Sequence, residues 1–86
     1  MQEIKIYTTK ICPYCVRAKL VLQRNNLKFT EIDASDKREW LMEKSGQRTV
    51  PQIWIGEHHV GGSDELVALE RAGKLLEMVN APAPPL

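Results

Sequence analysis

The two cysteines of this 86-residue chain, Cys12 and Cys15, are separated only by Pro13 and Tyr14. A segment with the alternation of a β-strand, residues 3–7, precedes them, and a segment with helical periodicity follows. Proline suits the first position of a helix, which makes Cys12 the N-cap. The free N–H groups and the dipole of that helix favour a thiolate there. The spacing therefore predicts a redox pair, with Cys12 as nucleophile and Cys15, one turn inside the helix, as resolving thiol.

Three other roles for the cysteine pair are less well supported. A structural disulfide that closes so short a loop would remove little entropy from the unfolded chain. A structural zinc site needs four ligands, and the adjacent residues His58 and His59 would point to opposite faces of a strand. A buried, inert pair stays open as an alternative, although the proline and the strand–helix context argue against it.

The next segments predict a βαβ unit and a second helix. Apolar residues recur at helical spacing over residues 13–25, and an alternating strand, residues 28–33, follows, so the two strands should be parallel. A second helix should run to Ser45, capped by Ser35 or Asp36 and ended by Gly46. The side chains expected to face the core are those of Cys15, Val16, Ala18, Leu20, Val21 and Leu22 in the first helix and of Trp40 and Leu41 in the second.

The last third of the chain predicts a hairpin and two helices. Strands at residues 52–55 and 58–60 flank Gly56-Glu57, and a glycine first in a two-residue loop suits the type II′ turn of an antiparallel hairpin. Helices over residues 63–71 and 74–79 should follow. The expected fold is α/β, with a four-stranded mixed sheet made of a βαβ unit plus a β-hairpin and with helices on both faces.

The length allows one small domain, expected over residues 1–79, with the proline-rich residues 80–86 as a flexible tail. A net charge of +1 gives no electrostatic reason to expect nucleic acid or an anionic membrane as partner. Neither a signal peptide nor an apolar run long enough to span a bilayer is found. We therefore expect a cytoplasmic, monomeric protein, in a reducing compartment where cysteine pairs cycle.

Two further motifs follow the cysteine pair. They are Thr49-Val50-Pro51, before the third strand, and Gly61-Gly62-Ser63-Asp64, at the start of the following helix. In this order and spacing, the motifs make the chain resemble the dithiol glutaredoxins, above all the small bacterial ones, over residues 3–79. The resemblance implies a thioredoxin-like fold with a cis bond before Pro51. It also implies a glutathione-dependent thiol–disulfide oxidoreductase.

The resemblance further implies a glutathione site. Val50 would pair through its backbone with the bound peptide, and Tyr14 would flank the sulfur. Lys10 and Arg38 match the family positions that meet the glycyl carboxylate, with a solvated helix charge as the alternative for Arg38. The full set of expected glutathione-binding residues is Lys10, Tyr14, Arg38, Thr49, Val50, Pro51, Gly62, Ser63 and Asp64.

At the far end of that site, free N–H groups where a helix begins at Gly62-Ser63 would hold the γ-glutamyl carboxylate, while Asp64 takes the ammonium. Ser63 as N-cap, with acidic residues in the first turn, is also ordinary helix chemistry, and both roles can hold together.

The mechanism implied by the resemblance uses glutathione as reducing co-substrate, with no metal, flavin or nicotinamide bound. Cys12 would attack protein–glutathione mixed disulfides and protein disulfides, and Cys15 would resolve the latter. Ribonucleotide reductase is a candidate partner. Two alternatives stay open: a glutaredoxin that holds an iron–sulfur cluster with glutathione, and a redoxin reduced by thioredoxin reductase. The C-P-Y-C motif departs from the C-G-F-S pattern typical of cluster carriers.

Overall fold

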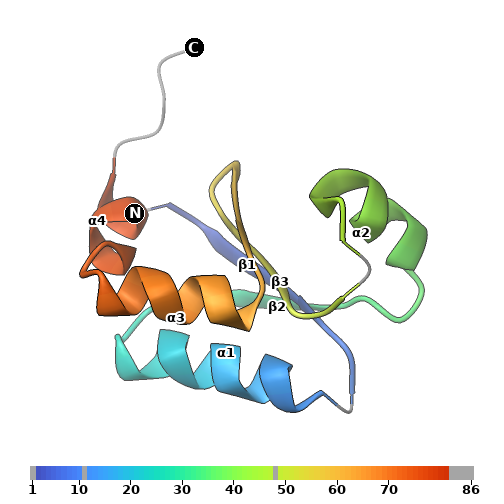
Figure 1. The fold of residues 1–86 in the computed structure, drawn as a ribbon, viewed down its shortest axis with the longest axis horizontal. Coiled ribbons are helices and arrows are strands. Elements are labelled where there is room, and N and C mark those ends of the chain that lie inside the picture. The colour runs from blue at the N-terminus through green and yellow to red at the C-terminus, as the bar shows by residue number, and fades with distance from the viewer. Residues whose placement is uncertain (1, 11, 48, 82–86) are drawn as a thin grey trace.

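The structure, a computed structural model, describes residues 2–10, 12–47 and 49–81 (Figure 1). Its elements are, in order, β1 (Ile4–Thr8), α1 (Pro13–Arg24), β2 (Thr30–Asp33), α2 (Arg38–Ser45), β3 (Gln52–Ile55), β4 (His58–Gly61), α3 (Ser63–Arg71) and α4 (Leu75–Asn80). The strands form one sheet in the order β2-β1-β3-β4. β1 is parallel to β2 and antiparallel to β3, and β3 is antiparallel to β4. The predicted βαβ unit and hairpin are therefore confirmed.

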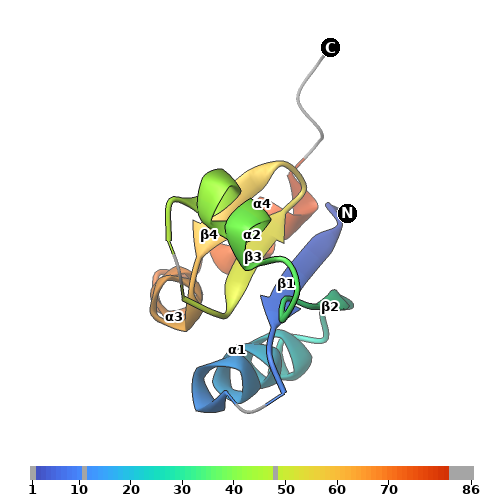
Figure 2. The ribbon, with the colours of Figure 1, turned by 90° about the vertical axis from the view of Figure 1, so that its right-hand side faces the viewer.

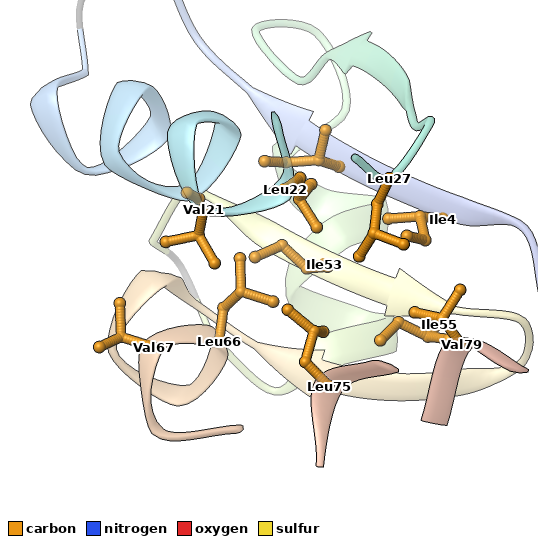
Figure 3. Packing of buried hydrophobic residues seen from close by; sticks show 12 residues of the cluster. Ile4, Val21, Leu22, Leu27, Ile53, Ile55, Leu66, Val67, Leu75 and Val79 are labelled. Atoms are coloured by element: carbon orange, nitrogen blue, oxygen red, sulfur yellow. The ribbon is translucent and has the colours of Figure 1, made fainter. Parts of the chain in front are cut away.

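The main core lies on one face of the sheet, where α1, α3 and α4 cover the two central strands (Figure 3). Alternation along β1 and β3 directs Ile4, Ile6, Ile53 and Ile55 to this face. The helices and the segment after α1 contribute Ala18, Val21, Leu22, Leu27, Leu66, Val67, Leu75 and Val79. Figures 1 and 2 show α1 and α3 side by side, with α2 on the other side of the strands.

The opposite face carries a smaller core of Tyr7, Ala34 and Leu41, the last of these from α2. Leu41 is buried as predicted, but the prediction that Trp40 is a core residue is wrong, because its side chain is 42% exposed. Successive helical residues lie about 100° apart, so only one of the two can point straight at the sheet. The Trp40 ring instead packs against the ring of Tyr7, with ring centroids 5.2 Å apart and the ring planes inclined by 38°.

The buried stripe of α1 is narrower than predicted. Cys15, Ala18, Val21 and Leu22 are buried as expected. Val16 and Leu20, predicted to widen that stripe, are more than half exposed. The helix contacts the sheet and α3 through one face only, which leaves these two side chains on its outer side.

The start of α2 also differs from the prediction. Its N-cap is Lys37 rather than Ser35 or Asp36. The Asp33 carboxylate accepts hydrogen bonds from the Ser35 backbone N–H (2.9 Å) and hydroxyl (2.6 Å), so Ser35 belongs to the turn that leaves β2. Gly46 ends α2 in the left-handed conformation, as predicted.

Near the C-terminus, α4 includes Asn80, which the sequence assigned to the flexible tail. Gln2 donates a side-chain hydrogen bond to the carbonyl of Ala81 (2.9 Å), which ties the end of α4 to the N-terminal segment. The rest of the predicted tail, residues 82–86, lies outside the described residues. None of the helices in the described ranges is long and apolar enough to cross a membrane.

The C-terminal ends of α1 and α3 are joined by a polar cluster. Glu70 of α3 forms an ion pair with Arg24 and accepts a hydrogen bond from the side-chain amide of Asn25 (2.6 Å). The hydrogen bonds from Arg24, then from Asn25, lower the pKa of Glu70 to about 2.

Candidate active site

Cys12 is the N-cap of α1, as the sequence predicts, with Pro13 in the first turn. Its Sγ accepts a hydrogen bond from the backbone N–H of Cys15 (3.2 Å). This donor, at the positive end of the helix dipole, stabilises negative charge on the sulfur. The side chain is half-buried and its thiol is free, so it can be reached by another sulfur atom.

Cys15, in contrast to Cys12, lies in the protein interior. Its side chain is 2% exposed, and burial, followed by the contact with Cys12, raises its pKa to about 12. At neutral pH this thiol is almost entirely protonated. The structure thus places one accessible sulfur, which accepts an N–H hydrogen bond at the start of α1, close to one buried thiol.

The loop before β3 lies against the accessible sulfur. The Val50–Pro51 peptide bond is cis, as the resemblance implies. The Cys12 thiol donates to the carbonyl of Val50, with Sγ 3.6 Å from the oxygen. The backbone of Val50 is therefore next to the point at which a disulfide would be attacked.

A hollow of about 200 Å³ opens beside this contact. It brings together most of the residues predicted for the glutathione site, namely Tyr14, Thr49, Val50, Pro51, Gly62, Ser63 and Asp64. Gln47 and Glu65 also line it, and the sequence analysis missed both. Glu65 could have been found, because it occupies the third helical position, where an acidic side chain reaches back to the N-cap. No sequence signal marks Gln47.

The start of α3 differs in detail from the prediction, since Gly62 rather than Ser63 is the N-cap. The Gly62 N–H donates to the carboxylate of Glu65 (3.1 Å). Gly61 has φ +119, and a Cβ there would lie 2.6 Å from Glu65 Oε1, so only glycine fits this turn. Ser63 becomes the first helical residue and is buried. Its hydroxyl has no hydrogen-bond partner among the residues that the structure describes.

Asp64 is more exposed and already has a cationic neighbour. Its carboxylate forms an ion pair with Arg17 of α1, with Nη1 and Oδ1 3.1 Å apart. Both side chains are largely in solvent. The sequence analysis missed Arg17, because the pair joins two helices that are distant in the chain.

The two predicted cations lie in other hollows. Lys10 shares a hollow of about 320 Å³ with Thr9 and Asp33. Arg38 lines a larger one, of about 760 Å³, beside Trp40. The structure therefore does not bring Lys10 or Arg38 into the hollow that holds the other predicted residues. Their contact with the glycyl carboxylate stays a prediction.

Across residues 2–10, 12–47 and 49–81, no three or more histidine, cysteine, aspartate or glutamate side chains are grouped so that they could hold a metal ion. The two neighbouring histidines of β4 differ in environment. His58 is exposed, whereas the ring of His59 stacks on Trp54 with centroids 4.5 Å apart.

This mixed sheet, with a cysteine pair at the start of α1 and a cis-proline loop against it, has the thioredoxin-like fold. Residues 4–60 match the family model described as Glutaredoxin. A glutaredoxin of Pseudomonas aeruginosa is 56% identical over 84 residues, which cover 94% of this chain and 100% of that protein. The chain belongs to the glutaredoxin family, and this membership supports thiol–disulfide oxidoreductase activity.

Solved structures agree with this assignment. A glutaredoxin from Brucella melitensis superposes with a TM-score of 0.83 at 46% sequence identity, covering 96% of both chains. A complex of buckwheat glutaredoxin with glutathione has a TM-score of 0.84 at 28% identity, covering 91% of this chain and 76% of that one.

Proposed function

We propose that the protein is a glutathione-dependent oxidoreductase that reduces protein–glutathione mixed disulfides and protein disulfides. The observation that carries this proposal is the position of the Cys12 sulfur, 3.6 Å from the Val50 carbonyl at the side of the hollow described above. A similar fold from buckwheat has been solved as a glutathione complex, which supports the choice of co-substrate.

With a mixed disulfide, the Cys12 thiolate attacks the glutathione sulfur. The new sulfur–sulfur bond forms as the old one breaks, and the substrate protein leaves as a thiolate that takes a proton from solvent. A second glutathione, as thiolate, then attacks the glutathione sulfur bound to Cys12. Oxidised glutathione leaves, and the Cys12 thiolate is regenerated.

With a protein disulfide, Cys12 attacks one of the two sulfurs and becomes joined to the substrate. Cys15, one helical turn away, loses its proton and attacks the Cys12 sulfur, which releases the reduced substrate and leaves a Cys12–Cys15 disulfide. Two glutathione molecules then return the pair to thiols by successive exchange and leave joined as oxidised glutathione, so glutathione supplies the two electrons.

The two ends of glutathione find chemically suitable groups around the sulfur. The backbone of Val50 offers the N–H and C=O of an extended strand to the peptide. At the start of α3, backbone N–H groups and the Ser63 hydroxyl, which has no partner in the described part of the chain, suit the γ-glutamyl carboxylate, and Asp64 suits its ammonium. Lys10 and Arg38 supply the positive charge proposed for the glycyl carboxylate.

We extend the proposal to the protein's substrates and to the cell compartment in which it acts. The substrates are glutathionylated and disulfide-containing proteins, and ribonucleotide reductase is one candidate. The site of action is the cytoplasm, where free thiols are maintained and a monomer of this kind can cycle.

The direct test is turnover of a small glutathione mixed disulfide by the purified protein, with glutathione and a coupled glutathione reductase. We expect turnover that requires glutathione and is absent with Cys12→Ser. A parallel reaction with thioredoxin reductase in place of glutathione serves as the control. Reduction supported by thioredoxin reductase alone would contradict the proposal.

A further inference from the structure

Gln52 is a buried polar side chain directly after the cis-proline loop. It is the first residue of β3, and its side chain is 0% exposed. Like Trp54, it lies on the face of the sheet opposite to Ile53 and Ile55. A buried amide is costly unless its donors and its acceptor are all paired, so its partners show what holds it in place.

The Gln52 amide has partners on both sides. Its Nε2 donates to the backbone carbonyl of Thr49 (3.0 Å) and to Oε1 of Gln47 (2.8 Å). Its Oε1 lies 2.7 Å from Nε2 of His59 on β4. Gln47 and Thr49 both line the hollow beside Cys12, whereas Gln52 and His59 do not.

These contacts fix the direction of every hydrogen bond in the group. The Thr49 carbonyl can only accept, so the amide nitrogen of Gln52 must face it. The amide oxygen therefore faces His59, whose Nε2 must carry a proton. Burial, and then the neighbouring His58, lowers the pKa of His59, in agreement with a neutral ring that holds its single proton on Nε2.

We infer that Gln52, which is buried, and His59, which is half-buried, are a hydrogen-bonded pair that positions the Thr49–Val50 backbone for the incoming peptide. The pair acts through this backbone, since neither side chain contacts the reacting sulfur. His59 orients the Gln52 amide, and the amide holds the loop at Thr49. This inference rests on the proposed function, because it takes the backbone of Val50 to be the edge on which glutathione lies.

The kinetic test uses Gln52→Met, which keeps side-chain length but removes the amide, and His59→Phe, which keeps a ring over Trp54 but removes the donor. His58→Phe, at the exposed neighbouring position, is the matched control. We expect Gln52→Met to raise the KM for a small glutathione mixed disulfide roughly fivefold, the factor typical of one net hydrogen bond, with little change in kcat. His59→Phe should raise KM less, and His59→Gln should restore it, because a glutamine amide can donate to Gln52 from that position.

The rate at which iodoacetamide alkylates Cys12 should change much less than KM in these variants, since this small reagent makes no use of the Val50 edge, although the Val50 carbonyl contacts the Cys12 thiol. An alkylation rate that falls in step with the rise in KM would show a general structural role and overturn the inference. An unchanged KM in both Gln52→Met and His59→Phe would overturn it as well.

A second measurement does not depend on activity. Nitrogen-15 NMR of the wild-type imidazoles should show His59 with its proton on Nε2, and His59→Phe should shift the amide signals of Thr49 and Val50, whereas His58→Phe should not. A proton on Nδ1 of His59, or unshifted loop signals, would overturn the inference. If the wild type fails to use glutathione, the proposed function is wrong, and the NMR result still decides whether the pair positions the loop.

Discussion

Replacing Cys15 with serine should separate the two reductions proposed for this protein. Removal of glutathione from a mixed disulfide needs only Cys12 and a second glutathione, so Cys15→Ser should keep that activity. Release of a protein bound to Cys12 through a disulfide uses the internal thiol, so this step should slow. Cys12→Ser should lose both reactions, because a hydroxyl at neutral pH is no substitute for a thiolate.

The size of the effect follows from the environment of Cys15. With a pKa of about 12, roughly one Cys15 in 10⁵ is a thiolate at pH 7. A well-oriented neighbouring group has an effective molarity of about 10⁵ M, so the small thiolate fraction of Cys15 acts like a free thiolate at about 1 M. Free glutathione at about 5 mM, with an ordinary thiol pKa of about 8.5, supplies about 0.15 mM thiolate. The internal attack is therefore faster by between roughly 10³- and 10⁴-fold.

This ratio is a lower limit, because part of the raised pKa of Cys15 comes from its contact with Cys12 and disappears once Cys12 is in a disulfide. The assay follows a substrate protein with a single disulfide at pH 7 in about 5 mM glutathione, a concentration at which the internal thiol should dominate. Non-reducing gels measure the lifetime of the covalent complex for the wild type and for Cys15→Ser, and a small glutathione mixed disulfide serves as the second substrate. Equal lifetimes, or loss of the small-substrate activity in Cys15→Ser, would refute this assignment of nucleophile and resolving thiol.

Three further predictions concern charged side chains. Lys10→Glu and Arg38→Glu should each raise the KM for glutathione by up to about fivefold, as expected for exposed ion pairs worth about 0.2–1 kcal/mol. The increase should be smaller in high salt. If steady-state kinetics show an unchanged KM for both variants, the glycyl carboxylate binds elsewhere. Arg17→Gln should lower that KM by up to about fivefold, because it frees Asp64 for the substrate ammonium, and an unchanged KM would show that the ion pair does not compete. Glu70→Gln should lower the free energy of unfolding by about 1 kcal/mol at pH 7, as expected for an ion pair whose Arg24 side chain is mostly in solvent. The ion pair with Arg24 of α1 lowers the pKa of Glu70 to about 2 in the folded protein, below its unfolded value of about 4.3. The stabilisation by Glu70 is therefore complete above about pH 4.3 and is lost as the pH falls to about 2. Urea unfolding at that pH should give similar free energies of unfolding for the wild type and for Glu70→Gln.

The parts of the site that the sequence predicted well are those fixed within one turn of chain. Proline is favoured at the first position of a helix, so the sequence predicts Cys12 as the cap and Cys15 one turn inside the helix. Gly46 is predicted to end α2 because glycine readily adopts the left-handed conformation. The turn at Gly56 was equally local, and its positive φ agrees with the predicted hairpin. In each case, the backbone conformation that a single residue favours or requires was enough to predict the local structure.

The wrong N-cap predictions for α2 and α3 arose where several polar neighbours competed for one role. Ser35 could cap α2, but its hydroxyl instead donates a hydrogen bond to Asp33 at the end of β2. Ser63 could cap α3, but Glu65 reaches back to the N–H of Gly62 and moves the cap by one residue. These choices depend on where the strands end, which propensity alone does not fix.

The contacts that the sequence missed are non-local, although one of them was within reach. A hairpin with a two-residue loop pairs Ile55 with His58 and Trp54 with His59. Gln52 then lies diagonally from His59 on the same face of the sheet, close enough for long side chains to meet. The ion pair of Arg17 with Asp64 had no such basis, because it depends on how two separate helices pack.

That packing brings the first turns of α1 and α3 to the same end of the fold. β1 and β4 are each antiparallel to β3, so both run in the same direction, and α1 and α3 follow them from the same edge of the sheet. The ion pairs of Arg17 with Asp64 and of Arg24 with Glu70 join the helices near their first and last turns, as parallel neighbours require (Figure 1). Two positive helix ends therefore face the same region. One directs the N–H of Cys15 at the Cys12 sulfur, and the other is the end at which we propose that the γ-glutamyl carboxylate of glutathione binds. The direction of the strands thus places the nucleophile and the proposed carboxylate site side by side, although about 50 residues separate them in the chain.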